Sequence, residues 1–550
     1  MQKNDIYEIE ITGMTDEGDG VGRINGFAVF VPYTIIGETV RIILIKVLKN
    51  YAVGKLIEVI IPSKSRTKSA CADFYKCGGC KLWHMSYEEE LLFKKKKVFD
   101  CLKRIGGFDN INIDDVVPSS KISRYRNKSQ FPVTPEGIGM YAVHSHRLIE
   151  MNDCLISSEV NKPILESVNY WMKKFGIEAY DELSDSGLIR NIYTRTGKSG
   201  TLVCIVTNGQ TLPRKKELID EIINCGTTIC GIVQNINIVK TNVLLGKETK
   251  TLYGNAELTD NISDIEFSIS PLSFYQINKP QTEKLYSLAR EYADLKGHET
   301  VLDMYCGIGT IGQFMARSAG KIIGVEVVPQ AIEDAKDNAK HNGIENAEYY
   351  CGKAESIIKQ IVNRGAKPDI AILDPPRKGC DKKLLDVLSD IKSLNKIIYI
   401  SCKPSTLARD LKYLNDKGFA PQKITPVDMF PRTPHIETVV ILSHKSPDRH
   451  IDVKVEFGEG KEKMPLDAIA ERAKKYQPKS KITYKMIQEY VKRNYGFKVH
   501  TAYIAEVKRS LGLTRYDAPN AVDDLKQPRK HPPKEKVEAI KDALKYFEVI

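Results

Sequence analysis

The sequence contains no run of about 18 uncharged apolar residues, the length that a membrane-spanning helix needs. Its first residues, Met-Gln-Lys-Asn-Asp, also lack the basic and then apolar layout of a secretory signal. We therefore expect a cytoplasmic protein without a membrane partner. In that reducing compartment the twelve cysteines are core residues, metal ligands or nucleophiles rather than disulfide partners.

The chain also lacks an excess of acidic residues. Its 82 lysine and arginine residues outnumber its 70 aspartate and glutamate residues, which gives a formal net charge of +12. A basic surface favours polyanionic partners such as RNA, because the bound phosphates release their counterions. An ordinary basic enzyme fits the charge alone equally well. We expect a monomer.

The N-terminal half is predicted to be rich in β-structure. At 550 residues the chain is too long for one core, and roughly 150 residues per domain predicts three or four units. Short alternating stretches with frequent glycines predict an OB-like barrel over residues 1–63. Strand-like runs predict a β-rich domain over 64–265. Within it, Ser86 and Glu89 form a capping box ahead of a helix at 86–105, which is expected to pack on the catalytic domain.

The C-terminal half changes character twice. Over residues 266–445, buried strands alternate with amphipathic helices, which predicts an α/β, Rossmann-like doubly wound parallel sheet. Residues 446–550 are charged, yet 483–496 and 501–512 are plausible helices. The extension is therefore either a small helical accessory domain that resembles a helix-turn-helix or a solvated tail.

A glycine-rich loop opens the predicted parallel sheet. The segment VLDMYCGIGTIG runs from a strand into Gly307, Gly309 and Gly312, where small residues let a nucleotide approach the backbone. Glu326 ends the next strand, where a carboxylate accepts hydrogen bonds from ribose hydroxyls. The pair predicts an adenosine-bearing cofactor but does not distinguish S-adenosylmethionine from NAD.

Three reactive side chains stand at the ends of later strands. Asp374 and Cys402 each follow a buried strand, and Glu437 begins the last apolar strand. Uracil C5 is a poor nucleophile, and addition of a thiolate at C6 creates an enolate that attacks an electrophilic methyl group. A base must then remove the C5 proton, so Cys402 and Glu437 together suit this chemistry. The Asp-Pro-Pro motif also serves amino-methyltransferases, but Arg377 replaces their aromatic residue.

Cysteines and basic residues gather between the barrel and the sheet. Cys71, Cys77 and Cys80 have the spacing of ligands to one metal centre, either an iron-sulfur cluster or structural zinc, and a fourth ligand is needed. The segment SRYRNKSQF, residues 123–131, interleaves basic and aromatic residues and could hold RNA phosphates and stack a base. An ordinary strand with a solvated basic face is the alternative.

The motifs LSFYQIN, LDMYCGIGTIG, GVE, LDPPRKG, SCKP and HIETVV, in this order, resemble the TrmA/RumA family of RNA uracil-5-methyltransferases over about residues 1–443. The resemblance implies an S-adenosylmethionine-dependent enzyme with Cys402 as the nucleophile and Glu437 as the base. It also implies four contacts to S-adenosylmethionine, from Gln276, Tyr305, Glu326 and Asp374. Lys403 departs from the family, which more often has Asn or Asp there. Asn278 and Gln281 are expected to cap the helix that follows.

The N-terminal third adds to the resemblance. Residues 1–63 resemble the TRAM domain, an RNA-binding barrel, and Cys154 is similar to the family's fourth ligand to a [4Fe-4S] cluster. The barrel and the cysteines together resemble the branch that methylates 23S rRNA, so 23S rRNA is the expected partner. The alternatives are a tRNA uracil-5-methyltransferase, an amino-methyltransferase acting on a purine in RNA, an RNA-binding protein with a relict fold, and an NAD-linked oxidoreductase.

Overall fold

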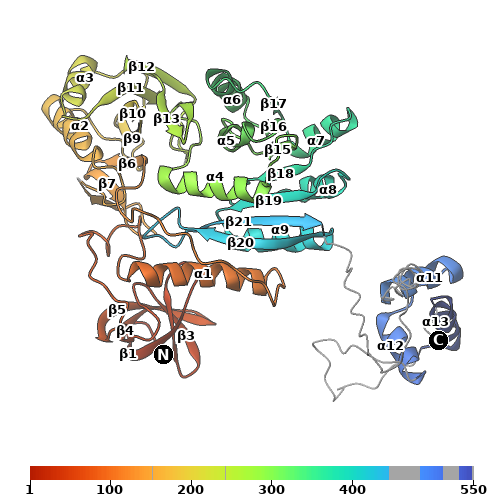
Figure 1. The fold of residues 1–550 in the computed structure, drawn as a ribbon. Helices are drawn as coiled ribbons and strands as arrows, with labels where there is room; N and C mark the ends of the chain where they lie inside the picture. The colour runs from red at the N-terminus through yellow and green to blue at the C-terminus, as the bar shows by residue number, and fades with distance from the viewer. Residues whose placement is uncertain (152, 242, 445–483, 512–531, 548–550) are drawn as a thin grey trace, which may run out of the picture. The chain divides into compact units, whose positions relative to one another are not determined.

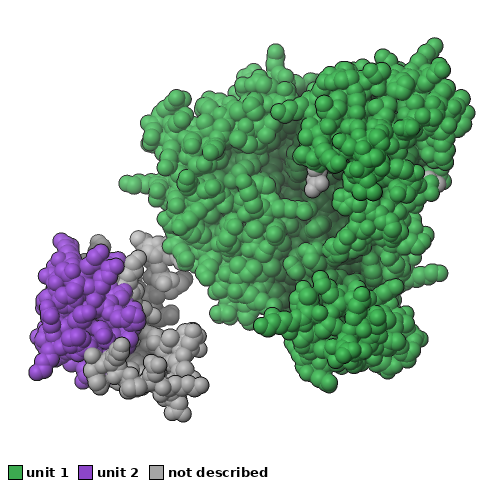
Figure 2. Space-filling model, turned by 180° about the vertical axis from the view of Figure 1, so that it is seen from behind, with its two compact units in different colours: residues 1–450 green, residues 451–550 purple. Residues whose placement is uncertain are grey.

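The computed structural model describes residues 1–151, 153–241, 243–444, 484–511 and 532–547 (Figure 1). The chain divides into two compact units, Met1–His450 and Ile451–Ile550, which are coloured separately in Figure 2. The first unit holds the predicted barrel, the β-rich region and the parallel sheet. No helix among the described residues is long and apolar enough to cross a membrane.

The N-terminal strands close into a barrel in the order β1-β2-β3-β5-β4. Its strands are β1 (Ile6–Met14), β2 (Gly20–Ile24), β3 (Phe27–Val31), β4 (Thr39–Val47) and β5 (Tyr51–Ile61). Alternate side chains point inward, and residues such as Ile11, Val29 and Ile42 are fully buried. A closed barrel leaves no free sheet edge.

Helix α1 (Tyr87–Arg104) follows the barrel in sequence but packs on the catalytic sheet. It begins at Ser86, whose side chain accepts a hydrogen bond from the Glu89 backbone, as the capping motif predicts. Val98 and Leu102 are buried in the same core as Leu411 of α9 (Pro404–Asp416). Figure 1 shows α1 running along the β20 and α9 side of the sheet.

The central region contains a seven-stranded sheet in the order β12-β11-β10-β9-β6-β7-β8. The strands are β6 (Lys128–Thr134), β7 (Gly137–Tyr141), β8 (Leu148–Glu150), β9 (Ile189–Gly197), β10 (Gly200–Thr207), β11 (Ile229–Ile236) and β12 (Glu248–Gly254). Two helices, α2 (Asn161–Phe175) and α3 (Lys215–Ile223), pack on it through a shared core. The hairpin β13 (Leu258–Ile262) and β14 (Ile265–Ile269) contributes to the catalytic core instead.

The catalytic sheet has the strand order β17-β16-β15-β18-β19-β21-β20. The strands are β15 (Thr300–Met304), β16 (Lys321–Glu326), β17 (Ala347–Cys351), β18 (Ile370–Leu373), β19 (Lys396–Ser401), β20 (Phe419–Val427) and β21 (Glu437–His444). The strands from β17 to β19 are parallel, whereas β21 runs antiparallel to both of its neighbours. The order reverses at β15, where open α/β sheets bind ligands.

Helices cover both faces of this sheet. They are α4 (Lys279–Ala293), α5 (Thr310–Ala316), α6 (Pro329–His341), α7 (Ala354–Asn363), α8 (Lys382–Ser389) and α9. Each face has its own core, because residues such as Leu302 and Tyr399 contribute to one cluster while Val301 and Ile398 contribute to the other. This alternation along the strands is the pattern of a sheet buried on both sides.

The second unit is helical in its described part, with α11 (Tyr484–Tyr495), α12 (Thr501–Ser510) and α13 (Lys534–Tyr546). Helices α11 and α12 lie in the two segments expected to be helical, and α13 is additional. Ile487 and Val491 of α11 pack against Ile540 and Leu544 of α13 in a small core. These three helices therefore share a hydrophobic centre of their own.

Candidate active site

The carboxyl ends of four parallel strands bring the predicted site residues to one edge. Tyr305 follows β15, Glu326 ends β16, Asp374 follows β18 and Cys402 follows β19. Adjacent strands in this sheet are paired in parallel, so their ends meet at the same edge. Tyr305 and Cys402, which are far apart in the sequence, therefore lie at the same edge of the sheet, with only β18 between their strands.

The antiparallel pairing of β19 with β21 adds Glu437 to that edge. Ser401 pairs with Thr438, and the same register continued by one residue sets Cys402 opposite Glu437. Directly opposed residues place their side chains on the same face of a sheet. The thiol and the carboxyl are close enough for Glu437 to raise the pKa of Cys402.

The Cys402 thiol is half-buried beside acidic neighbours. Burial, followed by the charges of Glu437 and Asp374, raises the pKa of Cys402 to about 11, while the positive charge of Arg377 opposes this rise. Lys403 precedes α9, so the thiol also lies near a helix N-terminus. The thiol therefore rests in its protonated form, with a cation and a helix end nearby that favour the thiolate.

Glu437 is buried, and its Oε2 atom has no hydrogen-bond partner within the described protein. Burial, and then repulsion by Asp374, raises the pKa of Glu437 well above its usual value, while Arg377 lowers it. A carboxylate with a raised pKa is a stronger proton acceptor than an exposed one. The unpartnered oxygen is free to meet a ligand.

The glycine loop and Glu326 form the other half of the edge. Tyr305 and Gly309 have left-handed backbones with φ of 65° and 84°, and the turn brings the Gly307 amide to Glu326 Oε2 at 3.3 Å. Glu326 Oε1 accepts hydrogen bonds from the amides of Val327 and Val328. These bonds fix the carboxylate at the end of β16, where a ribose would meet it.

Two buried residues at this edge, Asp303 and Tyr286, were not predicted as site residues from the sequence. Asp303 lies within β15, and its Oδ2 accepts a hydrogen bond of 2.8 Å from the Gly312 amide, which ties the glycine loop down. Burial raises the pKa of Asp303 to about 7. The Tyr286 hydroxyl of α4 shares a hydrogen bond with the Thr310 hydroxyl. Burial, and then the charges of Asp374 and Asp303, raise the pKa of Tyr286. The sequence did contain a signal for Asp303, because an acidic residue inside an otherwise apolar strand is unusual.

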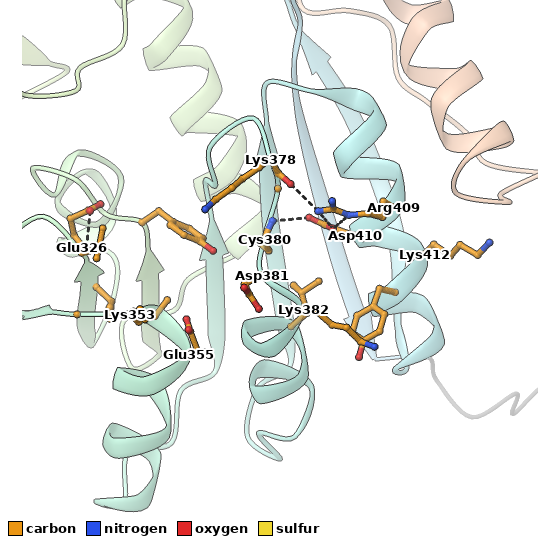
Figure 3. Close-up of a pocket in the computed structure, with 18 of the residues that line it drawn as sticks. Glu326, Lys353, Glu355, Lys378, Cys380, Asp381, Lys382, Arg409, Asp410 and Lys412 are labelled. Carbon is orange, nitrogen blue, oxygen red and sulfur yellow. Dashed lines mark hydrogen bonds and ion pairs between the residues drawn. The ribbon is translucent and has the colours of Figure 1, made fainter. Parts of the chain in front are cut away.

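A cavity of about 960 Å³ opens beside the cofactor half of the edge (Figure 3). Tyr305 and Glu326 line it together with basic side chains that include Lys353, Lys378 and Arg409. Figure 3 shows Glu326 on one side of the cavity and Arg409 on the other, across the ends of the parallel strands. Of the predicted site residues only Tyr305 and Glu326 line it, and Cys402 and Glu437 are not among its lining residues.

Gln276 is buried, and its carbonyl oxygen accepts a hydrogen bond of 3.0 Å from Asn127. The expected capping of α4 by Asn278 and Gln281 is wrong, because α4 has no side-chain cap bond. Both amides instead donate to backbone carbonyls beyond β20, Asn278 to Met429 and Gln281 to Asp428. Tertiary contacts have replaced the local capping pattern.

The four predicted ligand cysteines meet at a second cavity, of about 390 Å³. Cys71, Cys77, Cys80 and Cys154 all line it and are all free thiols. Among the residues that the structure describes, no group of three or more His, Cys, Asp or Glu side chains is arranged so as to hold a metal ion. The structure thus gathers the cysteines around one space without forming a tight single-ion site.

The predicted base-stacking role of the segment 123–131 is wrong. Tyr125 is buried and donates a hydrogen bond to the Pro431 carbonyl, and Phe131 is fully buried in the central core. Arg124 is paired with Asp153. Residues 128–131 form the start of strand β6, in which Phe131 is buried, whereas Tyr125 precedes the strand and is buried in a separate cluster.

Comparisons with known proteins agree with this architecture. A family model described as tRNA (Uracil-5-)-methyltransferase matches residues 240–445, and one described as TRAM domain matches residues 2–57. An RNA methyltransferase of Clostridium tetani is 44% identical over 450 residues, which cover 81% of this chain and 97% of that protein. One from Clostridium acetobutylicum is 45% identical, covering 80% and 98%.

The catalytic architecture also has a solved counterpart. The Pyrococcus abyssi tRNA (uracil-54, C5)-methyltransferase, in complex with S-adenosyl-L-homocysteine, is 28% identical with a TM-score of 0.65 and covers 79% of this chain and 99% of that one. Sequence motifs, sheet order and relatives therefore agree, and the chain belongs to the TrmA/RumA family of S-adenosylmethionine-dependent RNA (uracil-5-)-methyltransferases.

Proposed function

We propose that the protein methylates C5 of a uridine in RNA, with Cys402 as the nucleophile and Glu437 as the base. The observation that carries this proposal is that Cys402 and Glu437 adjoin the paired residues Ser401 and Thr438, close enough for Glu437 to raise the pKa of Cys402. Addition of a nucleophile at C6 and removal of a proton from C5 take place on adjacent carbons, so the two groups must act from neighbouring positions.

The proton and electron changes of this reaction balance. The Cys402 thiol first loses its proton to solvent, and the thiolate sulfur then bonds to C6 while the electron pair of the C5–C6 double bond moves into an enolate. S-adenosylmethionine supplies an electrophilic methyl group, which C5 takes up. Glu437 then accepts the C5 proton, the C5–C6 double bond re-forms, and Cys402 leaves as a thiolate. Arg377, which lowers the pKa of Cys402, favours the thiolate at both stages.

The acidic edge suits a cationic cofactor. After the effect of burial, the charge of Asp374 raises the pKa of both Asp303 and Glu437, and Glu326 also raises that of Asp303. A positive sulfonium would offset this repulsion, whereas the neutral thioether formed after methyl transfer would not. Glu326 is assigned to the ribose, and Asp374, Tyr305 and Gln276 to the remainder of S-adenosylmethionine.

The cysteine cavity is assigned to a [4Fe-4S] cluster held by Cys71, Cys77, Cys80 and Cys154. Four thiols around one cavity form the donor set of such a cluster. A four-iron cluster holds its ligands farther apart than a single zinc ion does, which suits a cavity-lined arrangement better than zinc. Iron and sulfide analysis of protein purified without oxygen tests this assignment, and stoichiometric zinc would contradict it.

We assign 23S rRNA as the substrate, because the TRAM barrel and the four cysteines resemble the branch that acts on it. The protein would then act in the cytoplasm, where ribosomes assemble. A tRNA substrate is the second candidate, because the Pyrococcus abyssi counterpart is described as acting on uracil 54 of tRNA.

Mass mapping of modified nucleosides tests both the chemistry and the target. In 23S rRNA from cells that carry the gene, we expect 5-methyluridine at a position that is unmodified in cells lacking it. Loss of 5-methyluridine from tRNA alone would move the assignment to tRNA. Methyl groups on an exocyclic nitrogen would overturn the C5 chemistry and favour an amino-methyltransferase.

A further inference from the structure

The loop between β20 and β21, residues 428–436, leads directly into Glu437, and we call it the base loop. Among the described residues Glu437 Oε2 has no hydrogen-bond partner, so the position of this oxygen depends on the backbone that carries Glu437. Helix α1 and the segment after the cysteine motif contact this loop directly, and Lys97 links it to the barrel. Their contacts have no role in the chemistry described above.

A buried ionic network fixes the start of the base loop to α1. Lys94 Nζ lies 2.7 Å from Glu90 Oε1 and 2.7 Å from Asp428 Oδ1, and all three side chains are fully buried. Lys94 also donates to the Phe430 carbonyl, and the Tyr87 hydroxyl donates to Asp428 Oδ2 at 2.8 Å. A buried charge that loses its partner is strongly unfavourable, so these residues hold one another in place.

Arg432 fixes the middle of the loop. Its backbone has φ of 68°, a left-handed conformation that a side chain such as arginine rarely adopts. Its amide donates to Glu90 Oε1 at 2.7 Å, its guanidinium donates to the Met85 carbonyl at 3.0 Å, and the same guanidinium stacks over the Trp83 ring at 4.8 Å. Such a conformation persists only where the surroundings impose it.

The base loop is also bonded to the segment that follows the last cysteine of the C-x5-C-x2-C motif. The amides of Lys81 and Leu82 donate to the Arg432 carbonyl at 3.0 and 3.2 Å. Farther along, Lys97 donates both to the Pro434 carbonyl in the base loop and to the Asp16 carbonyl in the barrel. The loop thus ties the barrel, the cysteine segment and α1 to the residue assigned as the base.

We propose that Lys94 and Arg432 are positioning residues for Glu437, and that the cysteine segment is part of the same clamp. The inference rests on the proposed role of Glu437. If the clamp loosens, Cys402 still adds to C6 and the methyl group is still transferred, but the C5 proton is removed slowly. The covalent protein–RNA adduct therefore accumulates, which would not follow from a general loss of folding or of RNA binding.

The test compares three variants of the full-length protein. Lys94→Met removes the buried charge, and Arg432→Gly removes the guanidinium while accepting the left-handed backbone. Arg66→Met is the matched control, because Arg66 makes a comparable pair with the buried Glu38 at 2.5 Å without touching the base loop. Each variant is assayed for denaturant-resistant adduct, turnover, RNA affinity and melting temperature.

We expect turnover to fall about 100-fold in Lys94→Met and Arg432→Gly, the effect of a displacement of about 1 Å at a catalytic group. The adduct fraction should rise at least about tenfold, while RNA affinity stays within about threefold, as for a group that acts after binding. Arg66→Met should lower the melting temperature without adduct accumulation. Should Lys94→Met fail to fold, Arg432→Gly alone decides the matter.

Two results would overturn the inference. One is slow turnover without adduct in both base-loop variants, and the other is equal adduct in Arg66→Met. Glu437→Gln, measured alongside, separates this failure from that of the proposed function. If Glu437→Gln traps adduct and the base-loop variants do not, only the clamp is wrong, whereas absence of adduct in Glu437→Gln overturns both.

Discussion

The chain uses thiols in two regions that differ in their neighbours. Cys402 stands at the sheet edge beside Glu437, Asp374 and Arg377, whereas Cys71, Cys77, Cys80 and Cys154 stand around one cavity. At the edge, after burial, carboxyl groups raise the pKa of the thiol. In the cavity, burial and then the charges of other cysteines raise the pKa of the Cys80 thiol. A thiol among acids and a cation is equipped for addition and elimination, and thiols among thiols are equipped to bind metal.

The two regions also differ in how the chain builds them. The edge is assembled by sheet register, from strand ends that are neighbours in space. The cavity joins a short loop after the barrel to Cys154, which lies beyond β8. The edge is therefore built from strand ends, whereas the four cysteines of the cavity lie on loops. Substitutions should therefore separate the two regions.

Removal of the edge thiol should have the largest effect. We expect Cys402→Ala to lower methyl transfer to RNA by about 10⁴-fold or more and to form no covalent adduct, because no other group can add to C6. Transfer of radiolabelled methyl groups measures this. Cys351→Ala, which removes an exposed thiol at the end of β17, is the control and should retain activity. Substantial turnover by Cys402→Ala would show that the reaction is not covalent.

Glu437→Gln should lower turnover by about 10² to 10⁴-fold, the usual contribution of a general base. Unlike Cys402→Ala, it keeps the nucleophile, so the adduct should persist and be visible on a denaturing gel. The amide has nearly the same volume, which makes a folding defect at this buried position small. Turnover near that of the unmodified protein would assign proton removal to another group.

Cys80→Ala should remove the cluster without removing the nucleophile. We expect iron to fall from about four atoms per chain to below one, since three thiols cannot complete the site. Cys204→Ala, in the buried core of the central sheet, should retain iron. If the cysteine segment clamps the base loop, the iron-free variant should also accumulate adduct. Full iron content in Cys80→Ala would exclude this cysteine as a ligand.

The pH dependence of Cys402 alkylation tests how the neighbouring charges set the pKa of this thiol. The pKa of about 11 lies above neutral pH, so the thiolate fraction, and with it alkylation of Cys402, should rise about tenfold per pH unit between 7 and 10. Arg377 lowers this pKa, so Arg377→Ala should raise it further and slow alkylation at pH 8 by about three- to tenfold. Peptide mass spectrometry after timed alkylation measures both. Faster alkylation of the variant would contradict the assigned influence of Arg377.

The edge could be predicted from the sequence because each of its residues stands at a strand end with a local signature. The clamp could not, since Lys94 and Asp428 are 334 positions apart and no periodicity relates them. Interleaved basic and aromatic residues do not reveal whether the aromatic rings are exposed, and those of Tyr125 and Phe131 are buried. Helix α13 has the apolar spacing of an amphipathic helix, with Val537, Ile540 and Leu544 on one face, so its sequence did contain a signal for a helix. The 23S rRNA target stays a prediction.

The smallest effect should come from a third region, which contains no cysteine at all. The relatives from the two Clostridium species match about 450 residues of this chain over almost their whole length, and the matched family model ends at residue 445. Both thiol regions lie in the first unit.

A chain ending after residue 450 should therefore keep its iron and transfer methyl groups to saturating RNA within about threefold of the full protein. Residues 446–550 carry 23 lysines and arginines against 16 acidic residues, so RNA affinity should fall and become less dependent on salt. Turnover measured at several salt concentrations separates these effects. Loss of turnover at saturating RNA would mean that the second unit acts on the catalytic edge itself.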